Sequence, residues 1–201
     1  MTGYFKIVNV IYWLALIVWI SALISAGVAA MNVFPSLDTL PLQLEQYAAY
    51  PAGEHPRLAA GRIMEGVFFL VDVLQFIAIP LTVLALLAQL LFFRLPLKRI
   101  SNAVRAAMIV IAAGLFACHA TMLAPKMNRE LRSFWSAAET GQVDEAQAHR
   151  RAFNAYHPRA DAILRINLLL LLVAAGASAA AFTPAPARGD TTLEQPRLLN
   201  S

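Results

Sequence analysis

Four long apolar runs constrain the fold of this chain more than any other feature of its sequence. A transmembrane helix needs about 20 mostly apolar residues to cross about 30 Å of hydrocarbon at 1.5 Å per residue. A segment in lipid must also satisfy its own backbone hydrogen bonds, which a helix does and an isolated strand does not. The runs that meet this length are residues 7–30, 63–93, 103–123 and 162–182. We therefore predict an all-α integral membrane protein built as a bundle of four transmembrane helices.

The composition agrees with a membrane location. The chain is 59% hydrophobic and 14% charged, whereas about 25% of the residues of soluble domains are charged. Lys and Arg at a lipid headgroup surface explain the net charge of +4, so we expect no nucleic-acid partner. The expected partners are the lipid bilayer and, within it, another membrane protein subunit or a second copy of the chain. Residues 1–182 form the predicted transmembrane domain, and the polar residues 183–201 a flexible tail. The first apolar run exceeds the usual length of a signal-peptide core, so we expect it to be retained.

With four spans, successive connections lie alternately at the two ends of the bundle. The N-terminus, the 94–102 loop and the C-terminus share one end, which we call end A. The 31–61 and 124–161 connections share the other, which we call end B. The 94–102 loop, "RLPLKRISN", is short, basic and free of acidic residues, which favours a cytoplasmic end A with both termini inside. The end B connections hold more basic residues in total, so this rule alone does not decide the orientation.

The connection between the third and fourth spans contains helical patterns of its own. Gly141 interrupts the stretch, and residues 143–156 follow with Phe153 and Tyr156 as apolar side chains and Arg150 and Arg151 as basic ones. Apolar and basic side chains on one short helix are typical of a helix that lies at a membrane surface. We therefore predict a short interfacial helical hairpin over about residues 126–156.

The second span carries polar side chains that lipid would not tolerate. The stretch "GRIMEGVFFLVDVLQFIAIP" contains Glu65, Asp72 and Gln75. At 100° per residue these three lie on one helix face about 80° wide. A charge that faces lipid at the bilayer centre costs at least about 2.5–3.5 kcal/mol. We therefore expect this face to point into the bundle.

Other spans supply polar side chains at a similar depth, in the half of the bundle near end B. His119 lies in the last turns of the third span, and Arg165 and Asn167 lie in the first turns of the fourth. The half near end A is mostly apolar, with exceptions that we place near the bilayer boundary: Asn9, Gln89 and Arg105.

Three interpretations of these polar residues remain open. One is a structural network in which Arg165 pairs with Asp72 or Glu65. Another is a water-accessible cavity, open to end B, that binds an ion or small ligand. The third is a surface for another subunit. The candidate ligand-binding residues are Glu65, Asp72, Gln75, His119, Arg165 and Asn167. Two carboxylates compete for one deep cation unless Arg62 reaches Glu65, so we expect a cavity that touches Asp72, His119 and Arg165.

Metal binding and catalysis have weaker support. The stretch "CHATM" places Cys118, His119 and Met122 within about one turn, and His157 precedes the fourth span. These are soft-metal ligand types, so haem or copper is a possible cofactor, although a core histidine explains His119 more simply. The sequence contains no nucleophile elbow, P-loop, Gly-rich dinucleotide turn or HExxH motif, and we predict no enzyme activity.

Four helix-boundary stretches carry a family resemblance over about residues 8–180. They are "MNVFPSLDTL", "AAGRIMEGVFFLVDVLQF", "LAPKMNREL" and "FNAYHPRADAILRINLLLLL". In this order they resemble the four-span bacterial membrane family of domain of unknown function 4149, which is related to the transmembrane protein 205 group. The positions that match are Pro35, Gly61, Pro125, His157, Arg165 and Asn167, and Pro158 departs from the small residue usual there. The resemblance implies a four-helix bundle in a bacterial inner membrane and implies no established activity.

The function that these observations favour is that of a non-enzymatic membrane component with a polar intramembrane site. It would handle a small solute or metal, or serve as an accessory subunit. The alternative is a haem- or copper-binding subunit for electron transfer in the membrane.

Overall fold

The computed structural model describes residues 2–182, and these residues form helices and connecting loops without a strand. The long helices are α1 (Thr2–Asp38), α2 (His55–Leu91), α3 (Ile100–Cys118), α4 (Ala124–Glu139) and α5 (Val143–Phe182). Two short 3-10 turns, η1 (Glu45–Tyr47) and η2 (Ala52–Glu54), lie between α1 and α2, and a π turn, η3 (His119–Leu123), joins α3 to α4. The predicted flexible tail lies outside the described residues.

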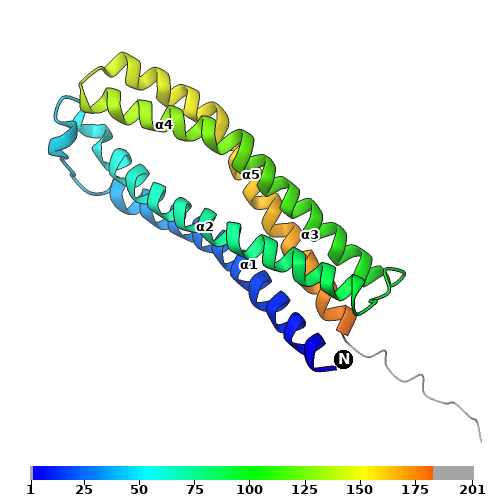
Figure 1. Cartoon of the computed structure of the whole chain (residues 1–201). Coiled ribbons are helices and arrows are strands. Elements are labelled where there is room, and N and C mark those ends of the chain that lie inside the picture. The colour runs from blue at the N-terminus through cyan, green and yellow to red at the C-terminus, as the bar shows by residue number, and fades with distance from the viewer. Residues whose placement is uncertain (1, 183–201) are drawn as a thin grey trace, which may run out of the picture.

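The helices form two long hairpins that lie side by side (Figure 1). In one hairpin α1 packs against α2, and in the other α5 packs first against α4 and then against α3. The N-terminus and the α2–α3 loop lie at one end, and the α1–α2 connection and the α4–α5 turn lie at the other (Figure 1). This is the predicted division of the connections between end A and end B.

The helices are longer than the predicted spans. Four continuous helical rods are apolar and long enough to cross a membrane. α1 and α2 have 37 residues each and α5 has 40, which corresponds to about 55–60 Å at 1.5 Å per residue. The predicted spans over 7–30, 63–93, 103–123 and 162–182 lie within these rods, except that α2 ends at Leu91 and the third span crosses into the π turn. Each of these helices is therefore nearly twice as long as a hydrocarbon layer of about 30 Å is thick.

The predicted hairpin over residues 126–156 exists, but it is not a separate unit. It consists of α4, which continues α3 through the π turn, and the first half of α5. α5 begins at Val143, as expected, but continues past Tyr156 and Pro158 into the fourth span. Pro158 leaves the carbonyl of Asn154 without its helical donor. Both residues are exposed, so solvent can satisfy that carbonyl and the helix need not end.

The π turn is a consequence of Pro125. Proline has no N–H to donate to the carbonyl four residues earlier, and its ring crowds that carbonyl. The backbone widens over His119–Leu123, where the Ala124 N–H bonds to the carbonyl of His119. Insertions of this kind are rare in helices and occur often at functional sites. Here the π turn sets the direction in which the side chain of His119 leaves the helix.

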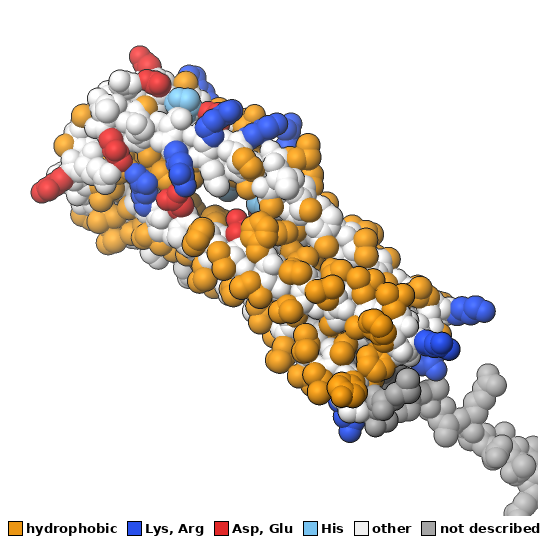
Figure 2. Space-filling view, viewed as in Figure 1, with side chains coloured by type: hydrophobic (Ala, Val, Ile, Leu, Met, Phe, Trp, Pro, Cys, Tyr) orange, Lys and Arg blue, Asp and Glu red, His pale blue; other side chains and the backbone are white. Residues whose placement is uncertain are grey.

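All four rods contribute to the apolar core of the bundle. Its fully buried centre contains large side chains from α1 and smaller ones from the other helices: Tyr12, Leu16, Trp19, Ala78, Ile109, Ala112, Leu171 and Ala174. Alanine at these contacts allows the helices to approach closely. The outer surface toward end A is also mostly apolar, whereas charged side chains gather at end B (Figure 2).

Gln89 and Arg105, two of the polar residues predicted near the bilayer boundary at end A, are buried within the bundle, and Asn9 is half-buried. Arg105 is 0% exposed, and its Nη2 donates to Oε1 of Gln89 at 2.8 Å. Gln89 in turn donates to Oδ1 of Asn9 at 3.5 Å, and the guanidinium lies 5.5 Å from the centre of the Tyr12 ring. The Tyr12 hydroxyl lies 2.6 Å from Oγ of Ser178. These contacts connect all four rods, because polar groups without water bond to one another.

The α4–α5 turn depends on a glycine. Gly141 has φ +72°, in the left-handed region that favours glycine, and a Cβ at this position would lie 2.8 Å from Cβ of Ala49. Gly66 in α2 offers a contrast, because a Cβ there would meet nothing within 4 Å. The first glycine is required by the turn, and the second is not required by packing.

We expect Gly141→Ala to destabilise the protein by at least about 1 kcal/mol, because a left-handed alanine is strained and the new methyl meets Ala49. Gly66→Ala, the matched control, should stabilise it by about 0.4–1 kcal/mol through the lower entropy of the unfolded chain. The thermal unfolding midpoints of the purified variants in detergent measure both changes. Shifts of the same sign would contradict this account of the turn.

Candidate functional site

Asp72, Gln75 and His119 lie at one level of the bundle. Two contacts set this level: the ring centres of Phe76 and Phe116 are 5.1 Å apart, and Nε1 of Trp19 donates to Oε1 of Gln75 at 3.2 Å. Asp72 lies one turn before Phe76 on α2, and His119 follows Phe116 by three residues on the antiparallel α3. Both therefore lie about 5–6 Å from the phenylalanine pair toward end B.

Asn167 reaches the same level from α5. It shares a buried helix face with Leu171, Ala174 and Ser178, which are four, seven and eleven residues further along. Ser178 contacts Tyr12, so Asn167 lies about 16 Å from that contact toward end B. The level of Asp72 follows from α1, because Trp19 lies seven residues beyond Tyr12 toward end B and contacts Gln75. Asp72 precedes Gln75 by three residues on α2, so it lies about 15 Å from the contact between Tyr12 and Ser178. We call Asp72, Gln75, His119 and Asn167 the mid-bundle cluster.

The mid-bundle cluster contains acceptor atoms without donors. Within residues 2–182, half-buried Asp72 forms no hydrogen bond or ion pair, and its charge interacts with His119. Nδ1 of His119 and Oδ1 of Asn167 are buried and have no hydrogen-bond partner among the protein atoms. A buried polar atom left unsatisfied costs about 1–3 kcal/mol. Gln75 differs from the others, because its Oε1 already accepts from Trp19.

The cluster is closed toward end A and less covered toward end B. Trp19 is 0% exposed and belongs to the apolar core, which continues toward end A. Toward end B, α2 separates from α4 (Figure 1). Figure 2 shows the surface hollowed between the two hairpins, with acidic and histidine side chains at the edge of the hollow. A small molecule could therefore approach the cluster between α2 and α4.

Arg165 does not join the cluster, so the predicted ion pair with Asp72 or Glu65 is wrong. Its side chain is 77% exposed, and Nη2 lies 2.8 Å from Oδ2 of Asp161, one turn earlier on the same helix. A partner four residues away needs no tertiary alignment, so the local pair forms. The predicted pocket that includes Arg165 is wrong for the same reason. Two open surface pockets lie elsewhere, on the α4–α5 turn and the outer side of α5, at residues 141–145 and at Gln147, Arg150, Arg151 and Asn154.

Glu65 belongs instead to a polar contact at end B. Its Oε2 lies 4.0 Å from Nη1 of Arg62, as expected for residues three apart on a helix. The side chains of both are 40% exposed. The two carboxylates of α2 therefore have different surroundings: Glu65 has a nearby arginine, and Asp72 has no ion pair within the described residues.

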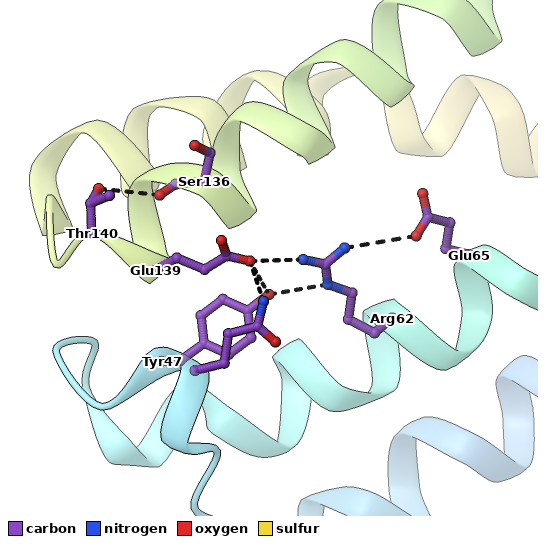
Figure 3. A network of polar contacts seen from close by, with 7 residues as sticks. Tyr47, Arg62, Glu65, Ser136, Glu139 and Thr140 are labelled. Carbon is purple, nitrogen blue, oxygen red and sulfur yellow. Dashed lines mark hydrogen bonds and ion pairs between the residues drawn. The ribbon is translucent and has the colours of Figure 1, made fainter.

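Arg62 connects the two hairpins at end B, a contact that we call the end B latch (Figure 3). Its Nη2 donates to Oε1 of Glu139 at the end of α4 at 3.0 Å, and its Nε donates to the Tyr47 hydroxyl at 3.1 Å. Gln46 donates to the same carboxylate oxygen at 2.6 Å, and the guanidinium lies 4.0 Å from the Trp135 ring centre. Burial raises the pKa of the Tyr47 phenol, so it stays neutral and able to donate.

The candidate metal ligands do not converge. Cys118 is exposed, and its Sγ lies 3.8 Å from Sδ of Met122, whose side chain is 62% exposed. His157 is exposed on α5, beside Phe153 at 5.5 Å between ring centres. Among the residues that the structure describes, no three His, Cys, Asp or Glu side chains form a group that could hold a metal ion. Cys118 and Met122 share an outer helix face, whereas His119 turns inward.

Sequence reasoning missed Tyr47, Glu139 and Trp135 as partners of Arg62. These residues lie on η1 and α4, and helix periodicity shows which face of a helix is apolar but not which side chain of another segment it meets. The available signal was Gly61, which the family resemblance singles out. A Cβ on Gly61 would lie 3.8 Å from Cζ2 of Trp135, so a small residue there lets α2 approach the Trp135 ring.

We expect Arg62 and Glu139 to be coupled by about 0.5–1 kcal/mol, because the pair is only partly exposed and Arg62 also covers an aromatic ring. A double-mutant cycle with Arg62→Met and Glu139→Gln, read from unfolding in detergent, measures this coupling. The control cycle uses Arg165→Met and Asp161→Asn, an exposed pair within one helix worth about 0.3–0.5 kcal/mol. A coupling at the end B latch no larger than the control value would show that it does not hold the hairpins together.

Comparisons with known proteins add no further evidence, because no family model, no curated protein and no solved structure matches the chain. The family resemblance therefore stays a prediction. The function has to be argued from the geometry of the mid-bundle cluster and from the surface of the bundle.

Proposed function

We propose that the chain is an integral membrane protein that binds a small polar solute at the mid-bundle cluster, which the solute reaches from end B. The observation that carries this proposal is the set of acceptor atoms without donors at Asp72, His119 and Asn167. Polar groups at membrane depth that find no partner within the protein are functional candidates. We assign no reaction to the site.

The surface supports a membrane location. Large apolar side chains are exposed on all four rods over the half nearer end A, among them Ile17, Phe76, Leu84, Val110 and Leu172. Water would make such a surface costly, whereas lipid does not. Charged residues bracket this zone, with Arg62 and Arg165 toward end B and Arg94 and Arg99 toward end A. By the levels given above, Asp72 lies about 4–5 Å closer to end A than Arg165, so it lies just inside the end B boundary of the proposed span.

The hairpin of α4 and the first half of α5 has a different place in this proposal. Phe134 and Trp135 of α4 are buried against Tyr47, Tyr50 and Leu58, so its apolar face is covered by protein. A helix that lies in the headgroup region presents that face to lipid. We therefore place the hairpin beyond the membrane at end B, as a stem, in place of the interfacial position expected from the sequence.

A small solute suits the cluster better than haem or copper. Both soft-metal ligands beside His119 lie on the exposed outer face of their helix, and a single imidazole is a poor site for either cofactor. An accessory subunit remains the second candidate, because the exposed apolar surface would suit a protein partner in the membrane as well as lipid.

We expect Asn167→Cys to react with a small, water-soluble methanethiosulfonate reagent in membranes, because water and solute reach the cluster from end B. Ala174→Cys is the matched control, since it lies on the same face of α5, is equally buried and is two turns closer to end A. Both variants carry Cys118→Ser, which removes the native exposed thiol. Labelling is measured by a gel-shift reagent.

Equal labelling at the two positions would contradict the proposal, and so would an inert cysteine at 167. Reaction at both would indicate a bundle that opens everywhere. Reaction at neither would indicate a dry polar network, which was the structural interpretation of the sequence.

We propose that the basic α2–α3 loop lies in the cytoplasm with both termini, because it is short and carries no acidic residue. In the same Cys118→Ser background, Ser101→Cys near this loop should resist an impermeant maleimide added to intact cells. Ser136→Cys, exposed on α4, should be labelled. The reverse result would place end B, and access to the cluster, on the cytoplasmic side.

A further inference from the structure

We infer that the solute of the mid-bundle cluster is a small cation that donates hydrogen bonds, of the class of protonated primary amines. This inference rests on the proposed function and specifies its ligand. The cluster combines a carboxylate whose charge is not neutralised by an arginine with two buried acceptor atoms on the facing helices. Each of these features selects for a different property of the ligand.

The charge of the ligand follows from Asp72. The two arginines that could neutralise it are engaged elsewhere, Arg62 with Glu139 at 3.0 Å and Arg165 with Asp161 at 2.8 Å. Within residues 2–182, Asp72 forms neither an ion pair nor a hydrogen bond. The titratable group with which its carboxylate interacts electrostatically is the imidazole of His119. A carboxylate held away from bulk water attracts a positive ligand.

The hydrogen-bonding character of the ligand follows from the neighbouring atoms. Oδ1 of Asn167, which is 2% exposed, accepts no hydrogen bond, and neither does Nδ1 of His119. The imidazole nitrogen is an acceptor in one of its two neutral tautomers. A carboxylate, an amide oxygen and an imidazole nitrogen together match a group with several N–H donors. An ammonium group has three donors and no acceptor.

Other cations fit the cluster less well. A quaternary ammonium has the charge but no donor, so it would leave Asn167 and His119 unsatisfied. Calcium and magnesium prefer six or more oxygen ligands, which exceeds what the cluster offers, and no three-ligand group exists in the described part of the chain. The buried Phe116 ring, three residues before His119 on the end A side, offers an apolar surface for a short alkyl group on the amine.

The test uses the full chain purified in detergent and n-butylammonium as the probe. A ligand that binds the folded state raises the unfolding midpoint with a saturable dependence on its concentration. We expect n-butylammonium to raise the midpoint in this way. Butyltrimethylammonium, with equal charge and no N–H donor, and n-butanol, with a donor and no charge, should each bind at least about tenfold more weakly.

Two variants test the assigned residues. Asp72→Asn should weaken n-butylammonium binding about tenfold or more, since a charge-assisted hydrogen bond becomes a neutral one. It should also unfold at a higher temperature without ligand, because it removes a half-buried charge. Glu65→Gln is the matched control on the same helix and should bind n-butylammonium as the unmodified protein does. Asn167→Leu, which removes one acceptor at similar size, gives an independent reading if Asp72→Asn does not fold.

The outcomes separate this inference from the proposed function. Equal stabilisation by n-butylammonium and butyltrimethylammonium would overturn the requirement for donors. Equal loss in Asp72→Asn and Glu65→Gln would overturn the assignment to Asp72. No stabilisation by either amine, together with a reactive cysteine at 167, would leave a solute site whose ligand is not an amine. An unreactive cysteine at position 167 would contradict the proposed solute site itself.

Discussion

Trp19 divides the interior of this bundle into two parts with different polar chemistry. Its ring is fully buried in the apolar core, and its N–H donates to Gln75 at 3.2 Å. On the end A side, Arg105 donates to Gln89 across helices, and Oδ1 of Asn102, beside the α2–α3 loop, has no hydrogen-bond partner. On the end B side, Asp72 and Asn167 have acceptors without donors. A polar site can exist next to an apolar core because one large side chain seals the boundary and satisfies its own polar atom.

The two hairpins are fastened at both ends of the bundle and less tightly between them. In lipid the hydrophobic effect gives little attraction between helices, so close packing and polar contacts decide which helices meet. At end A the contacts of Arg105 and Tyr12 cross between the hairpins, and at end B Arg62 crosses from α2 to α4. Between these contacts α2 and α4 separate, and the mid-bundle cluster lies beside this gap. The same arrangement that fixes the hairpins therefore leaves the cluster approachable from one side.

Sequence reasoning predicted the helical fold and the polar face of the second span, because both depend on periodicity and length. It failed where local chemistry decided the result. Pro125 and Pro158 lie between the third and fourth predicted spans, but a π turn and an exposed carbonyl let both helices continue through them. Arg165 seemed the partner of Asp72, but an acid one turn away on its own helix was easier to reach. The contact between Arg105 and Gln89 was not predicted, because sequence alone does not show which side chains of different helices meet.

The energetic cost of Asp72 in its position is itself an argument about function. A half-buried carboxylate without a partner destabilises the fold, whereas asparagine, of nearly the same size, would remove most of that cost. Structural roles for buried charges depend on a paired cation, and both nearby arginines have other acids. If a cationic solute occupies the cluster, its binding free energy offsets the cost whenever it is present, and the protein is most stable in the bound state. Because no group within the chain substitutes for the solute, the empty site stays at a higher free energy, and this difference strengthens binding of the solute.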